Sequence, residues 1–100
     1  MLVRLDDAAV DAALTRLVGW QRESDTLHKT ITLPSFAAAV AFVDDVAVVA
    51  IGLDHHPDIV IRQRRVTLTM TTHDADGLTE LDLDTAAAID AVVPPDAVVG

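Results

Sequence analysis

The sequence predicts an α+β fold in which helices pack on one face of a four-stranded antiparallel sheet. The first observation behind this prediction is the order of apolar periods along the chain, which runs helix, strand, strand, helix, strand, strand, helix. The second is a composition of 51% hydrophobic and 23% charged residues, which suits a packed globule and is too apolar for a disordered chain. Because 100 residues lie near the common domain size, we expect one domain over residues 1–100.

The first third of the chain predicts a helix followed by a hairpin. Asp6 can cap the helix, and Gly19 is placed to end it. Over residues 20–33 apolar and polar residues alternate, and Ser24-Asp25 is typical of a turn between short strands. The apolar residues at helical spacing in the first helix are Ala9, Val10, Ala13, Leu14 and Leu17.

A long apolar run, Phe36–Leu53, predicts the second helix, with Ser35 as its cap. Its length favours a helix over a strand despite its valines. A membrane span needs about 20 predominantly apolar residues, whereas this run has Asp44 and Asp45 near its centre. We therefore expect a helix buried between the sheet and a neighbouring subunit, and no membrane partner.

The last part of the chain predicts a second hairpin and a third helix. Ile59 and Ile61 indicate one strand, Gln63-Arg64 a tight connection, and alternation over residues 66–71 the next strand. The final helix opens at Thr79, with Asp82 three residues later as in an acidic variant of the capping box. These elements complete the predicted four strands and three helices.

Charge and cysteine content exclude several classes of function. The net charge of −9 opposes binding to phosphate backbones or anionic lipid, which need clustered Lys and Arg, so we expect no nucleic acid partner. The chain has no cysteine, which excludes disulfides and thiolate chemistry. Residues 1–7 lack the apolar core of a secretory signal, so we expect a cytoplasmic protein.

The stretch Asp54-His55-His56-Pro57 is the most informative part of the sequence, because it lies where the long helix should give way to a strand. His73 follows the second hairpin, so three of the four histidines should converge on one edge. Pro57 stiffens the turn that carries the paired imidazoles. With an ordinary pKa of about 6.5, clustered imidazoles can exchange protons near neutrality. We therefore interpret His55, His56 and His73 as an acid–base site.

Other interpretations remain open for the charged residues. Three imidazoles and Asp54 could in principle bind a divalent metal, but their spacing fits no helical metal motif, and we expect none. His28 is explained by strand alternation alone. The basic group Arg62, Arg64 and Arg65 is most simply a solvated turn or an ion-pair surface.

Five features together resemble the pterin-4a-carbinolamine dehydratase family. They are Gly19-Trp20, Leu53-Asp54-His55-His56-Pro57, Thr71-Thr72-His73, Gly77-Leu78-Thr79 and Asp82. A His-His-Pro alone would be weak evidence, whereas the same tripeptide followed by a hairpin, Thr-His and a Gly-Leu helix start is specific. The resemblance covers the chain from Gly19 through the last helix.

The resemblance implies a hydro-lyase that dehydrates 4a-hydroxytetrahydropterin to quinonoid dihydropterin, the recycling step after an aromatic amino acid hydroxylase, with no cofactor consumed. It also implies that His55 and His73 transfer protons and that His56 binds or assists. The residues that it implies in substrate binding or support are Asp54, Pro57, Trp20, Thr71, Thr72 and Asp82.

The resemblance further implies a homodimer or homotetramer built from helix and sheet-edge contacts. The sequence departs from the family at Ile51, where a polar residue is typical, and at Ile59 and Gln63, where aromatics are common. These changes concern the grip on the pterin or the choice of pterin more than proton transfer. Some relatives resemble noncatalytic assembly or binding proteins, including a Rubisco assembly factor, which gives an alternative function as a binding factor for a protein partner.

Overall fold

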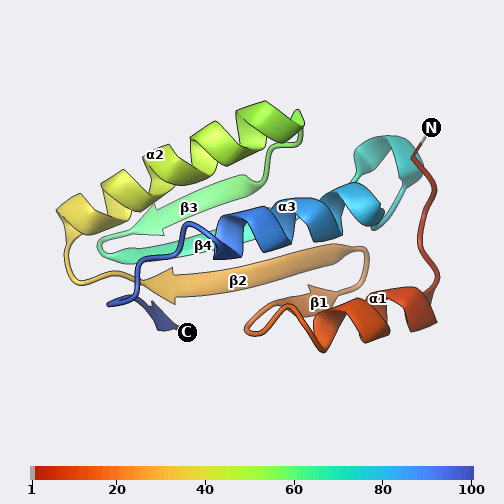
Figure 1. The fold of residues 1–100 in the computed structure, drawn as a ribbon, viewed down its shortest axis with the longest axis horizontal. Helices are drawn as coiled ribbons and strands as arrows, with labels where there is room; N and C mark the ends of the chain where they lie inside the picture. The colour runs from red at the N-terminus through yellow and green to blue at the C-terminus, as the bar shows by residue number, and fades with distance from the viewer. Residues whose placement is uncertain (1) are drawn as a thin grey trace.

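A computed structural model describes residues 2–100 and confirms the predicted α+β class (Figure 1). Helices and strands follow one another in the predicted order, with a 3₁₀ turn (η1) and a short last strand (β5) added. The elements are α1 (Asp7–Leu14), β1 (Gln21–Glu23), β2 (Thr26–Thr32), α2 (Phe36–Leu53), β3 (Asp58–Arg62), β4 (Arg65–Met70), η1 (His73–Ala75), α3 (Glu80–Asp90) and β5 (Val98–Val99).

The strands form one antiparallel sheet in the order β1-β2-β4-β3, so β3 is an edge strand. Both predicted hairpin turns form, and Ser24 and Gln63 adopt positive φ angles there. The sheet has a fifth strand that the sequence did not predict, since β5 pairs with β2 beyond the end of β1. Two residues are too few to show an alternating pattern, so this strand left no period to detect.

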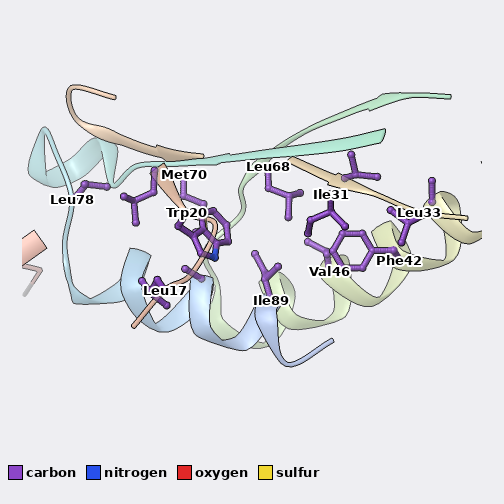
Figure 2. Packing of buried hydrophobic residues seen from close by; sticks show 14 of the residues in the cluster. Leu17, Trp20, Ile31, Leu33, Phe42, Val46, Leu68, Met70, Leu78 and Ile89 are labelled. Atoms are coloured by element: carbon purple, nitrogen blue, oxygen red, sulfur yellow. The ribbon is translucent and has the colours of Figure 1, made fainter. Parts of the chain in front are cut away.

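The helices cover one face of the sheet and enclose the core with it (Figure 2). Alternate residues of β2 and β4 point toward the helices and are buried, whereas the threonines between them face the other side. The largest apolar residues that are less than 2% exposed are Phe42, Leu27, Ile31, Leu33, Leu68, Met70, Leu78 and Ile89.

Helix boundaries agree with the capping residues more closely than with the apolar periods. α2 has the predicted bounds, and the Ser35 hydroxyl accepts a hydrogen bond from the Ala38 amide at 3.0 Å. α1 ends at Leu14 and not near Gly19, although Leu17 is still buried from the turn that follows. A side chain can reach the core from a turn as well as from a helix, so the apolar pattern extended the predicted helix too far.

One face of α2 packs on the sheet and α3, and much of the helix remains exposed. Its buried residues, spaced at helical intervals, are Ala39, Phe42, Val46 and Ala50. The 18-residue helix is long and apolar enough to cross a membrane by composition alone, with a mean hydropathy of 2.1 and 22% of its residues buried. Much of the apolar surface of α2 is therefore left uncovered by the rest of residues 2–100.

Candidate functional site

The end of α2 directs His55 away from the helix. Asp54 adopts the left-handed conformation, with φ of 51°, and its amide donates to the Ile51 carbonyl at 3.2 Å. The His55 amide donates to the Ala50 carbonyl at 3.0 Å, which closes the last turn. Asp is one of the few residues that tolerate this conformation. Pro57 is buried and fixes the backbone before β3, so the two histidines lie on a stiff connection.

His73 lies on a small closed loop after β4. The Thr72 amide donates to the Gly77 carbonyl at 3.1 Å, and the Gly77 amide donates to the Thr72 carbonyl at 3.3 Å. Between them the chain makes the single turn η1, and Asp76 takes a positive φ to close it. The loop therefore holds the exposed His73 side chain next to the end of β4.

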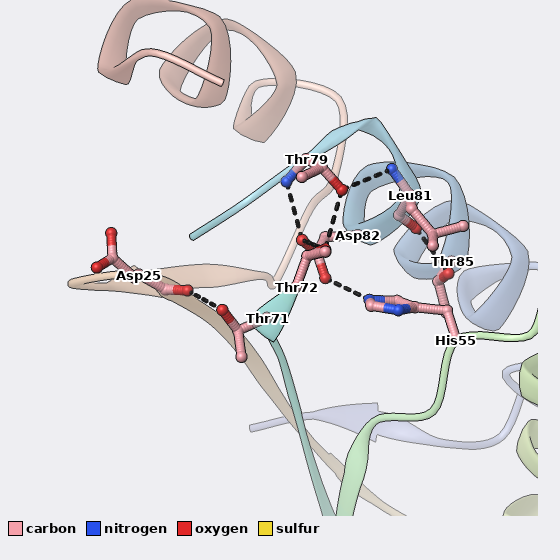
Figure 3. Close-up of polar contacts among 8 residues, drawn as sticks. All are labelled: Asp25, His55, Thr71, Thr72, Thr79, Leu81, Asp82 and Thr85. Carbon is pink, nitrogen blue, oxygen red and sulfur yellow. Dashed lines mark hydrogen bonds and ion pairs between the residues drawn. The ribbon is translucent and has the colours of Figure 1, made fainter. Parts of the chain in front are cut away.

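The buried carboxylate of Asp82 forms a hydrogen bond with the His55 side chain (Figure 3). His55 Nε2 lies 2.6 Å from Asp82 Oδ1, and the two side chains are 12% and 0% exposed. Asp82 Oδ2 accepts hydrogen bonds from the Thr72 hydroxyl at 2.7 Å and from the Thr79 amide at 2.9 Å. The second of these bonds is half of the predicted capping box of α3. One side chain thus both caps a helix and orients an imidazole.

His55, His56 and His73 all line one open hollow of about 490 Å³, as their convergence on one edge of the sheet predicts. Asp54, Thr71 and Thr72 line it as well. Four further lining residues were not predicted as site residues, since a single apolar or acidic side chain carries no signal of a site by itself. They are Leu2, Leu53, Asp74 and Leu81.

Three of the predicted supporting residues lie outside this hollow. Asp82 is buried in the interior, where it contacts His55. Pro57 lines a neighbouring apolar groove that His56 also borders. Trp20 is 4% exposed in the core, and its indole nitrogen donates to Asp90 Oδ1 at 2.9 Å. Lys29 binds the same oxygen at 2.8 Å. The geometry therefore gives Trp20 a packing role in the core.

The site is suited to proton exchange. His56 and His73 are exposed to the hollow, and Asp54 and Asp74 add two carboxylates at its rim. The C-terminus of α2, which carries partial negative charge, lies beside His55. Over residues 2–100, no three His, Asp or Glu side chains are arranged to hold a metal ion. The arrangement offers several imidazoles that can donate or accept a proton near neutrality.

Comparison with known proteins shows that the chain is similar to one protein family. Residues 3–92 match the model of the family described as pterin 4 alpha carbinolamine dehydratase. A protein of that name from Roseiflexus sp. (strain RS-1) is 50% identical over 93 residues, which cover 93% of this chain and 100% of the relative. Another from Chloroflexus aurantiacus (strain ATCC 29366) is 47% identical over 90% of this chain and 97% of its own.

Two solved structures resemble the fold. A transcriptional coactivator/pterin dehydratase from Brucella melitensis superposes with a TM-score of 0.87 at 32% identity, covering 91% of this chain and 99% of its own. A pterin dehydratase-like protein identified as a RuBisCO assembly factor in the alpha-carboxysome gives a TM-score of 0.60 at 26% identity, covering 73% and 84%. Proteins with this fold therefore carry names for two different kinds of function.

The buried position of Asp82 predicts a large effect on stability. Asp82→Ala removes the acceptor of three hydrogen bonds and should lower the free energy of unfolding by about 3 kcal/mol, measured by urea denaturation. Asp84→Ala is the matched control, because Asp84 is exposed on the same helix, and it should change stability by less than about 0.5 kcal/mol. Equal effects of the two substitutions would contradict the anchoring role of Asp82.

Proposed function

Because the chain belongs to the pterin-4a-carbinolamine dehydratase family, we propose that it dehydrates 4a-hydroxytetrahydropterin to quinonoid dihydropterin by histidine acid–base catalysis. The observation that carries the proposal is His55, hydrogen-bonded to the buried Asp82 while lining the same hollow as His56 and His73. The reaction is that of a hydro-lyase in pterin recycling, it consumes no cofactor, and we place it in the cytoplasm.

The chemistry requires one acid and one base. The hydroxyl on C4a leaves more readily when it is protonated, and the proton on N5 must be removed as the N5=C4a double bond forms. Two imidazoles on one hollow can supply both functions near neutral pH. His55 has a carboxylate partner, which favours the imidazolium that forms when it accepts a proton. His56 and His73 are the candidate acids.

The walls of the hollow suit a small, flat, polar heterocycle. Asp54 and Thr71 offer hydrogen-bonding groups, while Leu53 and Leu81 offer apolar surface against a ring. Ile51, which stands where the family has a polar residue, is 69% exposed and lines the neighbouring groove instead. The presence of isoleucine at position 51 therefore affects affinity for the ligand at the margin of the site and leaves the histidines in place.

A noncatalytic role in assembling a protein partner is the second candidate. It is supported by the RuBisCO assembly factor with the same fold and by the large exposed apolar surface of α2. Such a role needs a protein-binding surface and gives no reason for a buried Asp82 to orient an imidazole. The site geometry therefore favours the enzyme.

We also propose that the chain forms a homodimer through the edge strand β3. All five residues of β3 are exposed, and Ile59 and Ile61 are 37% and 38% exposed although they face the helix side of the sheet. An exposed, apolar edge strand tends to pair with another strand. The outward apolar side of α2, which includes Val48 and Ile51, offers a second contact that a homotetramer would use.

The sequence of β3, Asp-Ile-Val-Ile-Arg, is self-complementary in an antiparallel pair. If two copies pair about Val60, Asp58 of each faces Arg62 of the other, and Ile59 faces Ile61. Within one chain Arg62 lies opposite Arg65, a like-charged neighbour. The pairing across the dimer would therefore give each Arg62 an opposite charge that its own strand partner does not.

The activity prediction follows from the position of His55. Wild-type protein should accelerate dehydration of 4a-hydroxytetrahydropterin generated in situ, followed by ultraviolet absorbance. His55→Ala should lower the catalysed rate by roughly 100-fold, a typical acid–base contribution. His28→Ala should keep the wild-type rate, because His28 lies on β2 outside the hollow. No acceleration by folded wild-type protein over buffer would reject the enzyme and favour the assembly role.

Exchanging the charges at the two ends of β3 tests the proposed homodimer. Asp58→Arg or Arg62→Asp alone places two like-charged pairs across the interface and should raise the dimer dissociation constant by about tenfold, measured by analytical ultracentrifugation. The double variant restores opposite charges and should recover the wild-type constant. A wild-type protein that is monomeric at roughly 100 μM, or single variants that dimerise as well as wild type, would contradict this interface.

A further inference from the structure

We infer that the Thr72 hydroxyl, acting through Asp82, fixes the tautomer of His55 so that Nδ1 is the nitrogen that exchanges a proton with the substrate. Thr72 is thus a positioning residue for His55. The catalytic consequence rests on the proposed function, whereas the tautomer is a property of the protein without substrate.

The direction of the hydrogen bonds around Asp82 is determined by the donors available. The Thr79 amide can only donate, and it lies 2.9 Å from Asp82 Oδ2. The single hydroxyl proton of Thr72 is directed to the same oxygen at 2.7 Å. Thr72 and Thr79 hydroxyls also lie 2.9 Å apart, so Thr79 must donate to Thr72. Every group around Oδ2 therefore directs a proton toward the carboxylate.

The remaining oxygen of Asp82 then specifies the protonation of His55. Oδ1 lies 2.6 Å from Nε2, and an ionised carboxylate can only accept a hydrogen bond. Nε2 must therefore carry the proton. The opposite tautomer would direct a lone pair at an oxygen of a carboxylate that is 0% exposed, which is unfavourable.

The other ring nitrogen is left for chemistry. Among residues 2–100, His55 Nδ1 has no hydrogen-bond partner, and His55 lines the hollow. In a neutral ring with Nε2 protonated, Nδ1 carries a lone pair, as a general base requires.

In the proposed reaction the N5 proton passes to Nδ1, and the N–H electron pair forms the N5=C4a bond. The C4a–O bond breaks, and its oxygen takes a proton from an imidazolium at His56 or His73 and leaves as water. Asp82 then faces the imidazolium of His55.

Thr72 is the part of this arrangement that can be changed without removing the carboxylate or the cap. Thr72→Val preserves shape and leaves Oδ2 with one donor, the Thr79 amide. The carboxylate is then free to rotate away from Nε2. Thr72→Ser retains the hydroxyl. Thr85→Val is a matched control, because Thr85 is also buried but its hydroxyl donates to the Leu81 carbonyl of its own helix.

Nitrogen-15 NMR of the histidine rings in the substrate-free protein tests the tautomer. The pH of the sample is raised until the spectra stop changing, so that the rings are neutral. Wild type, Thr72→Ser and Thr85→Val should show His55 protonated on Nε2. Thr72→Val should show a mixture of tautomers. Wild-type His55 protonated on Nδ1, or an unchanged tautomer in folded Thr72→Val, would overturn the inference.

Kinetics of the same variants test the catalytic consequence. Thr72→Val should lower kcat for dehydration about tenfold with KM unchanged, and Thr72→Ser should recover most of the loss. A fall in Thr85→Val equal to that in Thr72→Val would show a general packing effect and contradict the positioning role. A wild-type protein without dehydratase activity would reject the proposed function, and the NMR result would then decide the tautomer by itself.

Discussion

The hydrogen bonds to the Asp82 carboxylate join three separate parts of the chain at one buried point. Thr72 comes from the end of β4, Thr79 from the start of α3, and His55 from the connection between α2 and β3. A buried carboxylate without partners is strongly unfavourable, so these elements are held together as a unit. The orientation of His55 is therefore a consequence of the way α3 begins, and folding and the site depend on the same contact.

The other end of α3 is held by a second carboxylate. Asp90, the last residue of the helix, binds Lys29 on β2 and the indole of Trp20. Lys29 is 5% exposed, so its ammonium group needs such a partner. With Asp82 at its first turn and Asp90 at its last residue, α3 is fixed on the sheet at both ends.

The fold was predictable to the extent that local patterns determine it. Strand alternation, the caps Ser35 and Thr79, and the two hairpin turns each act over a few residues and match the structure. β5 was missed because its position depends on an edge of β2 that only the folded sheet presents. The end of α1 was misplaced because Leu17 is buried from a turn. Both differences arise from tertiary contacts that no local period records.

In the candidate site, too, local motifs were visible in the sequence, whereas contacts between distant residues were not. The histidines and Pro57 form a visible motif, but the contact between His55 and Asp82 spans 27 positions, and the capping role alone could explain the aspartate. Trp20 was linked to the site by family resemblance, whereas its indole reaches Asp90 in the core. Leu2 and Leu81 gave no signal, since only the folded chain brings them to the hollow. Roles that depend on distant partners could not be assigned from the sequence.

In the proposed reaction, the carboxylate of Asp82 presents His55 to a pterin bound in the hollow. A crystal structure of the protein with a stable reduced pterin tests it most directly. We expect the pterin to lie among His55, His56 and His73, with N5 within about 3.2 Å of His55 Nδ1. A pterin bound elsewhere, or one in the hollow with N5 turned away from His55, would contradict it.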